Sequence, residues 1–217
     1  MVIQDIKISN NTLYLILCSF ILINLYITNT IVITDEIIHD TFSLEISSEE
    51  IRQILLFKKK YGWISYVAQP MALLIKIYFT AGCLFMGLMI YDVRVKFSKI
   101  LRTVLLGEFV FVIYTVFRLG FIYTKDFSSL EQIQKFWPLS LFSLFSSDSI
   151  PQWLFYPLYT INIAEIAYWL VLSLGLTYLI KTKFLQSLKT VLTSYGAGLL
   201  LWMVFLVFVQ LYFLESV

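Results

Sequence analysis

Long apolar segments with few or no charged residues dominate the chain and are separated by shorter polar segments. A transmembrane helix needs about 20 mostly apolar residues to cross a hydrocarbon layer about 30 Å thick. Five segments meet this requirement, so the pattern predicts an all-α polytopic membrane bundle that forms a single integral membrane domain over residues 1–217. The predicted transmembrane helices cover residues 13–33, 61–91, 103–123, 150–180 and 191–214.

Two of the predicted spans are longer than the bilayer requires. Residues 61–91 contain Pro70 near their start, and residues 150–180 contain Pro157. Because proline interrupts helical hydrogen bonding, we expect each span to begin as an interfacial helix that kinks at its proline. The first span has a longer apolar run than a signal peptide and no small-residue cleavage site, so it is predicted to remain as an anchor.

The polar segment at residues 34–60 is large enough for structure outside the bilayer. Ser47 and Glu50 have the spacing of a capping box, which marks the start of a helix. Apolar residues then recur at helical spacing from Ile51 onward. Two alternatives remain open: an amphipathic helix that lies on the membrane, or a simple extension of the second span.

A further element outside the spans is predicted at residues 136–149. Pro138 suits the first turn of a helix, and Ser140, Ser143 and Ser147 form a narrow polar stripe among aromatic and aliphatic residues. The segment is too short to cross the bilayer, so we expect a short interfacial or re-entrant helix. This helix either seals the rim of the bundle or serves as a docking surface or gate.

The composition supports lipid as the solvent for most of the chain. Hydrophobic residues make up 59% of the sequence and charged residues 14%, whereas soluble domains contain about 25% charged residues. The net charge of +2 argues against nucleic acid as a partner, and two cysteines are too few for a secreted disulfide scaffold. The lipid bilayer is therefore the first predicted partner.

Lysine and arginine predict the orientation, because cytoplasmic loops retain these residues. Outside the spans, the segments on the side of the N-terminus carry eight of them and the segments on the opposite side carry six. Residues 34–60 add six acidic residues to the opposite side, although Lys58, Lys59 and Lys60 run against this trend. We predict a cytoplasmic N-terminus, an external C-terminus and a non-cytoplasmic loop at residues 34–60.

Four ionisable residues lie inside the predicted spans, and their formal charges sum to zero: Lys76, Glu108, Arg118 and Glu165. At the centre of a bilayer each costs about 2.5–3.5 kcal/mol on insertion scales, so each must face a partner or water. Glu108 and Arg118 are ten residues apart, or about 15 Å along one helix. These two residues therefore belong to opposite leaflets, and Arg118 is one candidate partner for Glu165.

Lys76 and Glu165 lie at the same depth in the predicted topology. We expect a polar cluster of these two residues with Asn162, which is one helical turn from Glu165, and with Asn24 at the middle of the first span. Such a cluster either holds the helices in register or forms a proton or substrate path in which Glu165 titrates.

Ser194 and Gly198 form a small-residue pair in the fifth span. Small residues four positions apart allow a second helix to approach closely. The pair is a candidate helix-packing patch, either within the bundle or in a homo-oligomer.

The inventory of reactive residues argues against catalysis. The single histidine, His39, lies in a polar segment, which excludes haem ligation by two histidines, di-iron sites and H-E-x-x-H zinc sites. The sequence contains no phosphate-binding or nucleophile-elbow motif. No catalytic, cofactor-binding or metal-binding residue is therefore predicted.

Aromatic motifs mark the C-terminal half of the chain. They are Phe136-Trp137-Pro138, the run at residues 156–162, and Tyr168-Trp169-Leu170 followed by Leu174-Gly175-Leu176. In these motifs the chain resembles the Yip1-like group of five-span membrane proteins. The resemblance implies a non-enzymatic protein that works through contacts with other membrane proteins and keeps its N-terminus inside. With this resemblance, a bacterial inner (plasma) membrane is the predicted location.

The favoured function is that of an accessory or scaffolding subunit of a membrane complex, with another membrane protein as partner and protein export or membrane organisation as the process. The alternative is a small transporter or ion-conducting protein that uses the region of Lys76 and Glu165. Because five helices are few for a transporter, this alternative requires a homo-oligomer.

Overall fold

The computed structural model describes residues 8–43, 46–125, 127, 129–146 and 150–215. Within these ranges the chain forms helices, turns and irregular segments but no β-strand. Five helical segments are long and apolar enough to cross a membrane. They are α1 (Asn10–Ile27) with the π-helical turn η1 (Thr28–Val32), α4 (Trp63–Ile90), α5 (Phe97–Thr124), α8 (Ile163–Ile180), and the continuous run of α9 (Phe184–Val191), η5 (Leu192–Gly196) and α10 (Ala197–Glu215). The predicted all-α polytopic bundle is confirmed, and the chain is an integral membrane protein.

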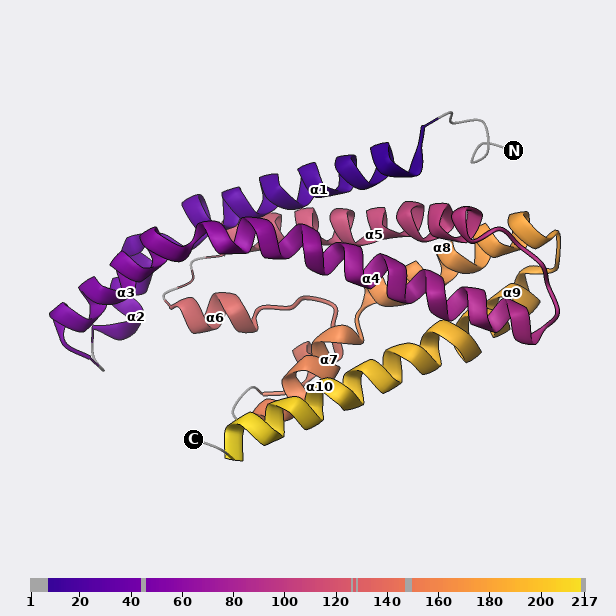
Figure 1. Ribbon diagram of the computed structural model, residues 1–217. Helices are drawn as coiled ribbons and strands as arrows, with labels where there is room; N and C mark the ends of the chain where they lie inside the picture. The colour runs from indigo at the N-terminus through magenta and orange to yellow at the C-terminus, as the bar shows by residue number, and fades with distance from the viewer. Residues whose placement is uncertain (1–7, 44–45, 126, 128, 147–149, 216–217) are drawn as a thin grey trace.

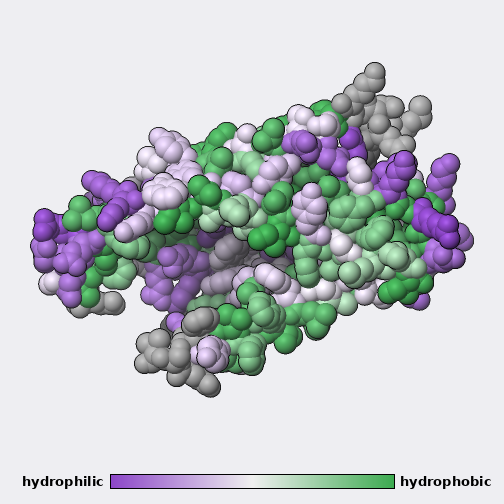
Figure 2. Space-filling model, in the orientation of Figure 1, coloured by the Kyte–Doolittle hydropathy of each residue, from purple (hydrophilic) through white to green (hydrophobic). Residues whose placement is uncertain are grey.

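The long helices run back and forth, so the two ends of the chain lie at opposite ends of the bundle (Figure 1). We call the end where α1 begins the N-side and the end where α10 finishes the C-side. Hydrophilic residues gather at both ends, and the surface between them is largely hydrophobic (Figure 2). A helical bundle that crosses a bilayer requires this banding.

The short helices lie on the C-side of the bundle (Figure 1). The first span is followed by α2 (Asp35–Phe42) and α3 (Ser48–Tyr61). Between α5 and α8 the chain forms α6 (Leu130–Lys135), the 3-10 turns η2 (Leu141–Leu144) and η4 (Gln152–Leu154), and the short helix α7 (Phe155–Thr160). The connections between long helices on the N-side, residues 91–96 and 181–183, are much shorter.

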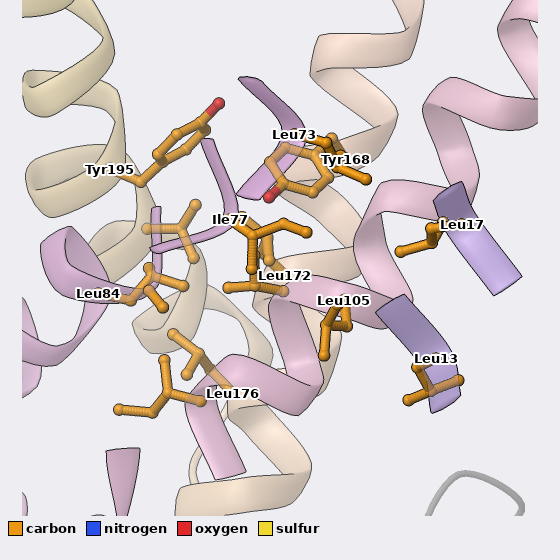
Figure 3. Close-up of a cluster of buried hydrophobic side chains, with 14 of the residues drawn as sticks. Leu13, Leu17, Leu73, Ile77, Leu84, Leu105, Tyr168, Leu172, Leu176 and Tyr195 are labelled. Atoms are coloured by element: carbon orange, nitrogen blue, oxygen red, sulfur yellow. The ribbon is translucent and has the colours of Figure 1, made fainter. Parts of the chain in front are cut away.

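Helix α5 lies at the centre of the bundle and contacts α1, α4 and α8. Apolar side chains from these helices and from η5 meet in one continuous core (Figure 3). A smaller cluster on the C-side joins Val32, Ile122 and Ile133. Because lipid is as apolar as these side chains, close packing holds such helices together. The fully buried members of the main core include Leu17, Ile77, Leu84, Ile100, Val104, Leu172 and Leu176.

Helix α5 begins at Phe97 rather than at residue 103, as the sequence predicted. The apolar criterion missed its first turns because they contain Lys99 and Arg102. Long basic side chains can keep their charge at the membrane surface while their stems follow the helix. The Arg102 guanidinium donates a hydrogen bond to the Ile8 carbonyl oxygen at 2.7 Å. The helix therefore extends toward the N-side beyond its uncharged part.

The fourth span begins at Ile163, so the predicted helix over residues 150–180 was wrong in its first part. Asn162 is the N-cap of α8, and its side-chain oxygen accepts a hydrogen bond from the backbone N–H of Glu165 at 2.9 Å. Figure 1 shows that α8 starts about midway along its neighbours α4 and α5. On the C-side, the space beside α4 and α5 that a longer α8 would occupy is filled by the short elements between α5 and α8.

In the described part of residues 136–149, the predicted helix is reduced to the short 3-10 turn η2. Leu139 adopts a left-handed conformation (φ 58°), and the chain then forms a strand-like bridge with the residues before α8. The Leu141 N–H donates to the Ile161 carbonyl oxygen at 2.9 Å, and the Ile163 N–H donates to the Leu139 carbonyl oxygen at 3.0 Å. These hydrogen bonds satisfy backbone groups just before α8, where the chain is not helical.

The predicted serine stripe binds the backbone of its own segment. The Ser140 hydroxyl donates to the Trp137 carbonyl oxygen, and the Ser143 hydroxyl donates to the Ser140 carbonyl oxygen, both at 2.7 Å. Ser147 lies outside the described residues. Serine hydroxyls commonly compete with helical hydrogen bonding in this way.

Helix α3 begins with the predicted capping box. The Ser47 N–H donates to Oε2 of Glu50 at 2.8 Å, and the Glu50 N–H donates to the Ser47 hydroxyl. Hydrogen bonds from the Ser47 side chain and backbone lower the pKa of the Glu50 carboxyl group. Gly62, in helical conformation, then joins α3 to α4. Helix α3 is therefore a separate helix that leads almost directly into the second span.

A matched pair of glycine substitutions tests the packing of α5 against α8. A Cβ atom at Gly107 would lie 2.7 Å from the ring of the buried Tyr168, whereas a Cβ at Gly82 would meet nothing within 4 Å. We expect Gly107→Ala to lower the stability by about 1–3 kcal/mol through overpacking. Gly82→Ala should leave the stability unchanged or raise it by about 0.5–1 kcal/mol. Equal unfolding temperatures for the two variants in detergent would contradict this packing.

Candidate functional site

A charged pair lies near the middle of the bundle. Nζ of Lys76, on α4, is 2.9 Å from Oε2 of Glu108, on α5. The Lys76 ammonium also lies 3.4 Å from the ring centroid of Phe111 and 5.3 Å from that of Tyr168. A desolvated cation–π contact stabilises an ammonium by about 2 kcal/mol. Glu108 is buried, whereas Lys76 keeps 37% of its side chain exposed.

The sequence predicted that Lys76 pairs with Glu165, and the structure instead pairs it with Glu108. The reason is the start of α5 at Phe97, which moves Glu108 away from the end of its span and brings it level with Lys76. Glu165 remains close to the pair, because Tyr168, one turn further along α8, faces the same ammonium.

Glu165 lies in the first turn of α8 and is buried. Its Oε1 atom accepts hydrogen bonds from Nε1 of Trp169 at 2.7 Å and from the Tyr195 hydroxyl at 2.8 Å. Both donors are neutral, and Glu165 has no ion-pair partner in the described part of the chain. The positive end of the α8 dipole also favours a carboxylate at this position.

Three buried polar atoms beside the charged pair have no hydrogen-bond partner among the described residues. They are Oγ1 of Thr80, Oε1 of Glu108 and the hydroxyl of Tyr168. Tyr168 has Thr80 and Glu108 as polar neighbours, and Figure 3 shows its hydroxyl directed toward Ile77 of α4. Leaving a buried polar group unsatisfied costs about 1–3 kcal/mol. Three such atoms together distinguish this place from an ordinary apolar core.

Arg118 lies on the C-side of the charged pair and is bound by backbone groups rather than by Glu165, its candidate partner from the sequence. Its Nε donates to the Phe136 carbonyl oxygen at 2.8 Å and its Nη2 to the Ile133 carbonyl oxygen at 3.1 Å. The guanidinium also lies 4.2 Å from the ring centroid of Trp137. A planar group with several donors suits an irregular backbone. Arg118 thus holds α6 and the residue that follows it against α5.

Asn24 does not join the Lys76 cluster that the sequence predicted. It lines a cavity of about 230 Å³ together with Thr28, Arg118 and Trp137. Asn24 was expected beside Lys76 only because it lies at the middle of the first span. The rotation of α1 instead turns Asn24 toward α5 and the segment after α6.

One polar face of α4 is covered on the N-side and open on the C-side. Gln69, Lys76 and Cys83 follow one another at intervals of seven residues and share this face. At Cys83 the face meets α10, because a Cβ atom at Gly198 would lie 2.6 Å from the Cys83 Sγ. Gln69 is exposed and Lys76 partly exposed. Figure 1 shows the cause: α10 diverges from α4 toward the C-side.

The predicted small-residue patch packs against α4 within the chain. A Cβ atom at Gly87 would lie 2.5 Å from the Cβ of Ser194, and Gly198 adjoins Cys83. Both members of the patch therefore lie where the last span approaches α4 closely. A role in a homo-oligomer stays a prediction.

Thr80, Trp169 and Tyr195 belong to the site but were not predicted from the sequence. Trp169 follows Glu165 by four residues, the spacing of neighbours on a helix, and could have been found from that. Asn162 and Glu165 also have the spacing of an N-cap and the third helical residue, which marks a helix start. Thr80 and Tyr195 reach the site from other elements and give no local signal.

The donor set of the site suits protons and hydrogen-bonding groups. It contains two carboxylates, an ammonium, hydroxyls and an indole. Across the described ranges, no group of three or more histidine, cysteine, aspartate or glutamate side chains could hold a metal ion.

Comparison with protein families, with curated proteins and with solved structures found no match to this chain. The resemblance to Yip1-like proteins therefore remains a prediction. The function proposed below therefore rests on the geometry of the site.

The two members of the charged pair should differ in their effect on stability. Removing one partner of a buried ion pair costs about 3–5 kcal/mol. We expect Lys76→Met to approach this loss, because it leaves the two buried acidic groups without a cation. Glu108→Gln should cost less, because Lys76 then remains close to Glu165. Thermal unfolding in detergent measures both variants.

Arg52→Met is the control for these substitutions, because Arg52 forms an exposed ion pair with Glu49. We expect a loss below about 1 kcal/mol for this variant. A larger loss for Glu108→Gln than for Lys76→Met would contradict the assignment of Lys76 to both carboxylates.

Proposed function

We propose that this protein is a non-enzymatic accessory or scaffolding subunit of a membrane complex, and that it binds another membrane protein along the open part of α4. One observation carries the proposal. Gln69 is exposed and Lys76 partly exposed on the same face of α4 that α10 covers at Cys83. The partner would continue this coverage toward the C-side.

Acyl chains are a poor cover for these two polar side chains. The Lys76 ammonium already contacts Glu108 and Phe111, but part of the side chain stays exposed. The amide of Gln69 is penalised if it remains unbonded in an apolar medium. A partner helix with hydrogen-bonding side chains removes this cost. Such contacts contribute about 0.6 kcal/mol each on average and specify which helices meet. The occupant that fits best is therefore a transmembrane helix with polar residues on one face.

The position of α10 keeps this face of α4 accessible. On the C-side α10 is held by α7 and η4. Nε1 of Trp202 donates to the Tyr156 hydroxyl at 3.1 Å, and Nε2 of Gln210 donates to the Gln152 carbonyl oxygen at 3.2 Å. Figure 2 shows a hollow between the α10 arm and the rest of the bundle.

The orientation and the process are part of the same proposal. The larger number of lysine and arginine residues on the N-side supports a cytoplasmic N-terminus and an external C-terminus. A bacterial inner membrane is the proposed location. Protein export or membrane organisation is the proposed process for such a subunit.

A small oligomeric transporter or ion-conducting protein is the second candidate. It is favoured by the start of α8 midway along the bundle beside Lys76, Glu108 and Glu165. Broken helices at the membrane midplane form binding sites in many transporters. A symmetric homo-oligomer with proton or solute flux in liposomes would favour this candidate, whereas a stoichiometric larger partner would favour the accessory role.

Photo-crosslinking in native membranes tests the proposed partner face. A photoreactive amino acid at Gln69 should give a protein adduct of one defined mass. The same amino acid at Val116, which is exposed on α5, should give no protein adduct, because lipid covers that surface. The matched position separates a specific partner from random collisions.

The composition of the adduct decides between the candidates. Coexpression of a second, differently tagged copy shows whether the adduct contains another copy of this chain. A self-adduct would contradict the accessory role. The same adducts from Gln69 and Val116, or none from either, would contradict a partner on this face of α4.

A further inference from the structure

The charges at the centre of the bundle do not balance when all groups have their ordinary protonation. Lys76 forms an ion pair with Glu108 and is the basic neighbour of Glu165. Arg118 is bound to the backbone carbonyl groups of another segment. With both carboxylates ionised, the cluster would carry one excess negative charge. An uncompensated charge is strongly unfavourable in a medium of low polarity.

We propose that Glu108 and Glu165 together bind one proton. The neutral cluster then contains one carboxyl group, one carboxylate and the Lys76 ammonium. The proton comes from water and is held by an O–H bond to a carboxylate oxygen, and no other bond forms or breaks. This proton site goes beyond the proposed partner binding and does not depend on it.

The unpartnered oxygen atoms provide a place for this proton. Oε2 of Glu108 is engaged with Lys76, whereas Oε1 has no partner among the described residues. A proton on Oε1 turns this atom from an acceptor into a donor. The neighbouring oxygens of Thr80 and Tyr168, which also lack partners within the described ranges, can then accept its hydrogen bond. The exposed fractions of Thr80, Glu108 and Tyr168 are 0%, 2% and 0%, so bulk water does not compete.

The other groups around the carboxyl pair add no charge of their own. Hydroxyl, thiol and indole groups are neutral at pH 7 under ordinary conditions, and α1 contributes Leu13, Leu17 and the thiol of Cys18 to this core. The neutral polar neighbours are Thr80 and Cys83 on α4, Tyr168 and Trp169 on α8, and Tyr195 on η5. The balance of formal charges therefore rests on Lys76, Glu108 and Glu165, and the start of α8 adds only a partial positive charge beside Glu165.

Infrared spectroscopy of the full chain in lipid nanodiscs can detect the bound proton. The C=O stretch of a protonated carboxyl group is separate from that of a carboxylate and shifts in D₂O. At neutral pH we expect the signal of one buried carboxyl group. Glu108→Gln and Glu165→Gln should each abolish it, because Lys76 balances the remaining carboxylate. Lys76→Met should double it, whereas Glu131→Gln on α6 should leave it unchanged.

Several outcomes would overturn the proposal. One is a folded wild-type protein without the signal at neutral pH, and another is a signal that survives both glutamine substitutions. A signal that appears only when sodium and potassium are replaced by choline would assign the site to an alkali metal ion instead. Either glutamine variant suffices if the other does not fold.

Tyr168→Phe provides a second test that leaves all three charges in place. Loss of the neighbouring hydroxyl should shift the frequency of the carboxyl signal without removing it. An unchanged frequency would overturn the placement of the proton beside Glu108. Crosslinking at Gln69 is independent of these spectra, so the proton site and the partner face can fail separately.

Discussion

Within a bilayer, charges and interrupted backbone must be satisfied by the protein itself, and this constraint determines the centre of the bundle. Charged groups and interrupted backbone occur at the same depth in the bundle, where Lys76 pairs with Glu108 and α8 begins after Asn162. The bridge between residues 139–141 and 161–163 supplies hydrogen bonds that a continuous helix would have made. The Asn162 side chain caps the first turn. The charged groups and the helix start therefore occupy one continuous polar site.

The break before α8 also accounts for the course of α10. The described residues of the segments 136–146 and 150–162 fill the C-side of the bundle with short elements, and α10 packs on α7 and η4 there. The face of α4 that is covered at Cys83 is consequently open at Gln69 and Lys76 (Figure 1). One departure from a regular five-helix bundle thus produces both the buried site and the polar opening beside it.

The number of spans and the intramembrane ionisable residues could be predicted, because apolar length and the rarity of charge are local properties of the sequence. Which charged residues pair depends on their depth in the bundle, and this depth depends on where each helix begins and ends. Hydropathy does not determine these helix ends. Because Lys99 and Arg102 are charged, the predicted start of α5 was too late, and Glu108 was predicted too close to the end of its span. The helix expected at residues 136–149 failed for a different reason, since that segment bonds to residues 161–163, which are distant in sequence.

The distance from Nζ of Lys76 to the glutamate carboxyl carbons tests the charged centre most directly. Solid-state NMR dipolar recoupling between nitrogen-15 lysine and carbon-13 glutamate measures it in lipid bilayers. A Glu131→Gln background removes the other lysine–glutamate ion pair of the described residues. We expect strong dephasing of the Lys76 signal that Glu108→Gln removes and Glu165→Gln retains. Dephasing that depends on Glu165 instead, or no dephasing at all, would contradict this arrangement.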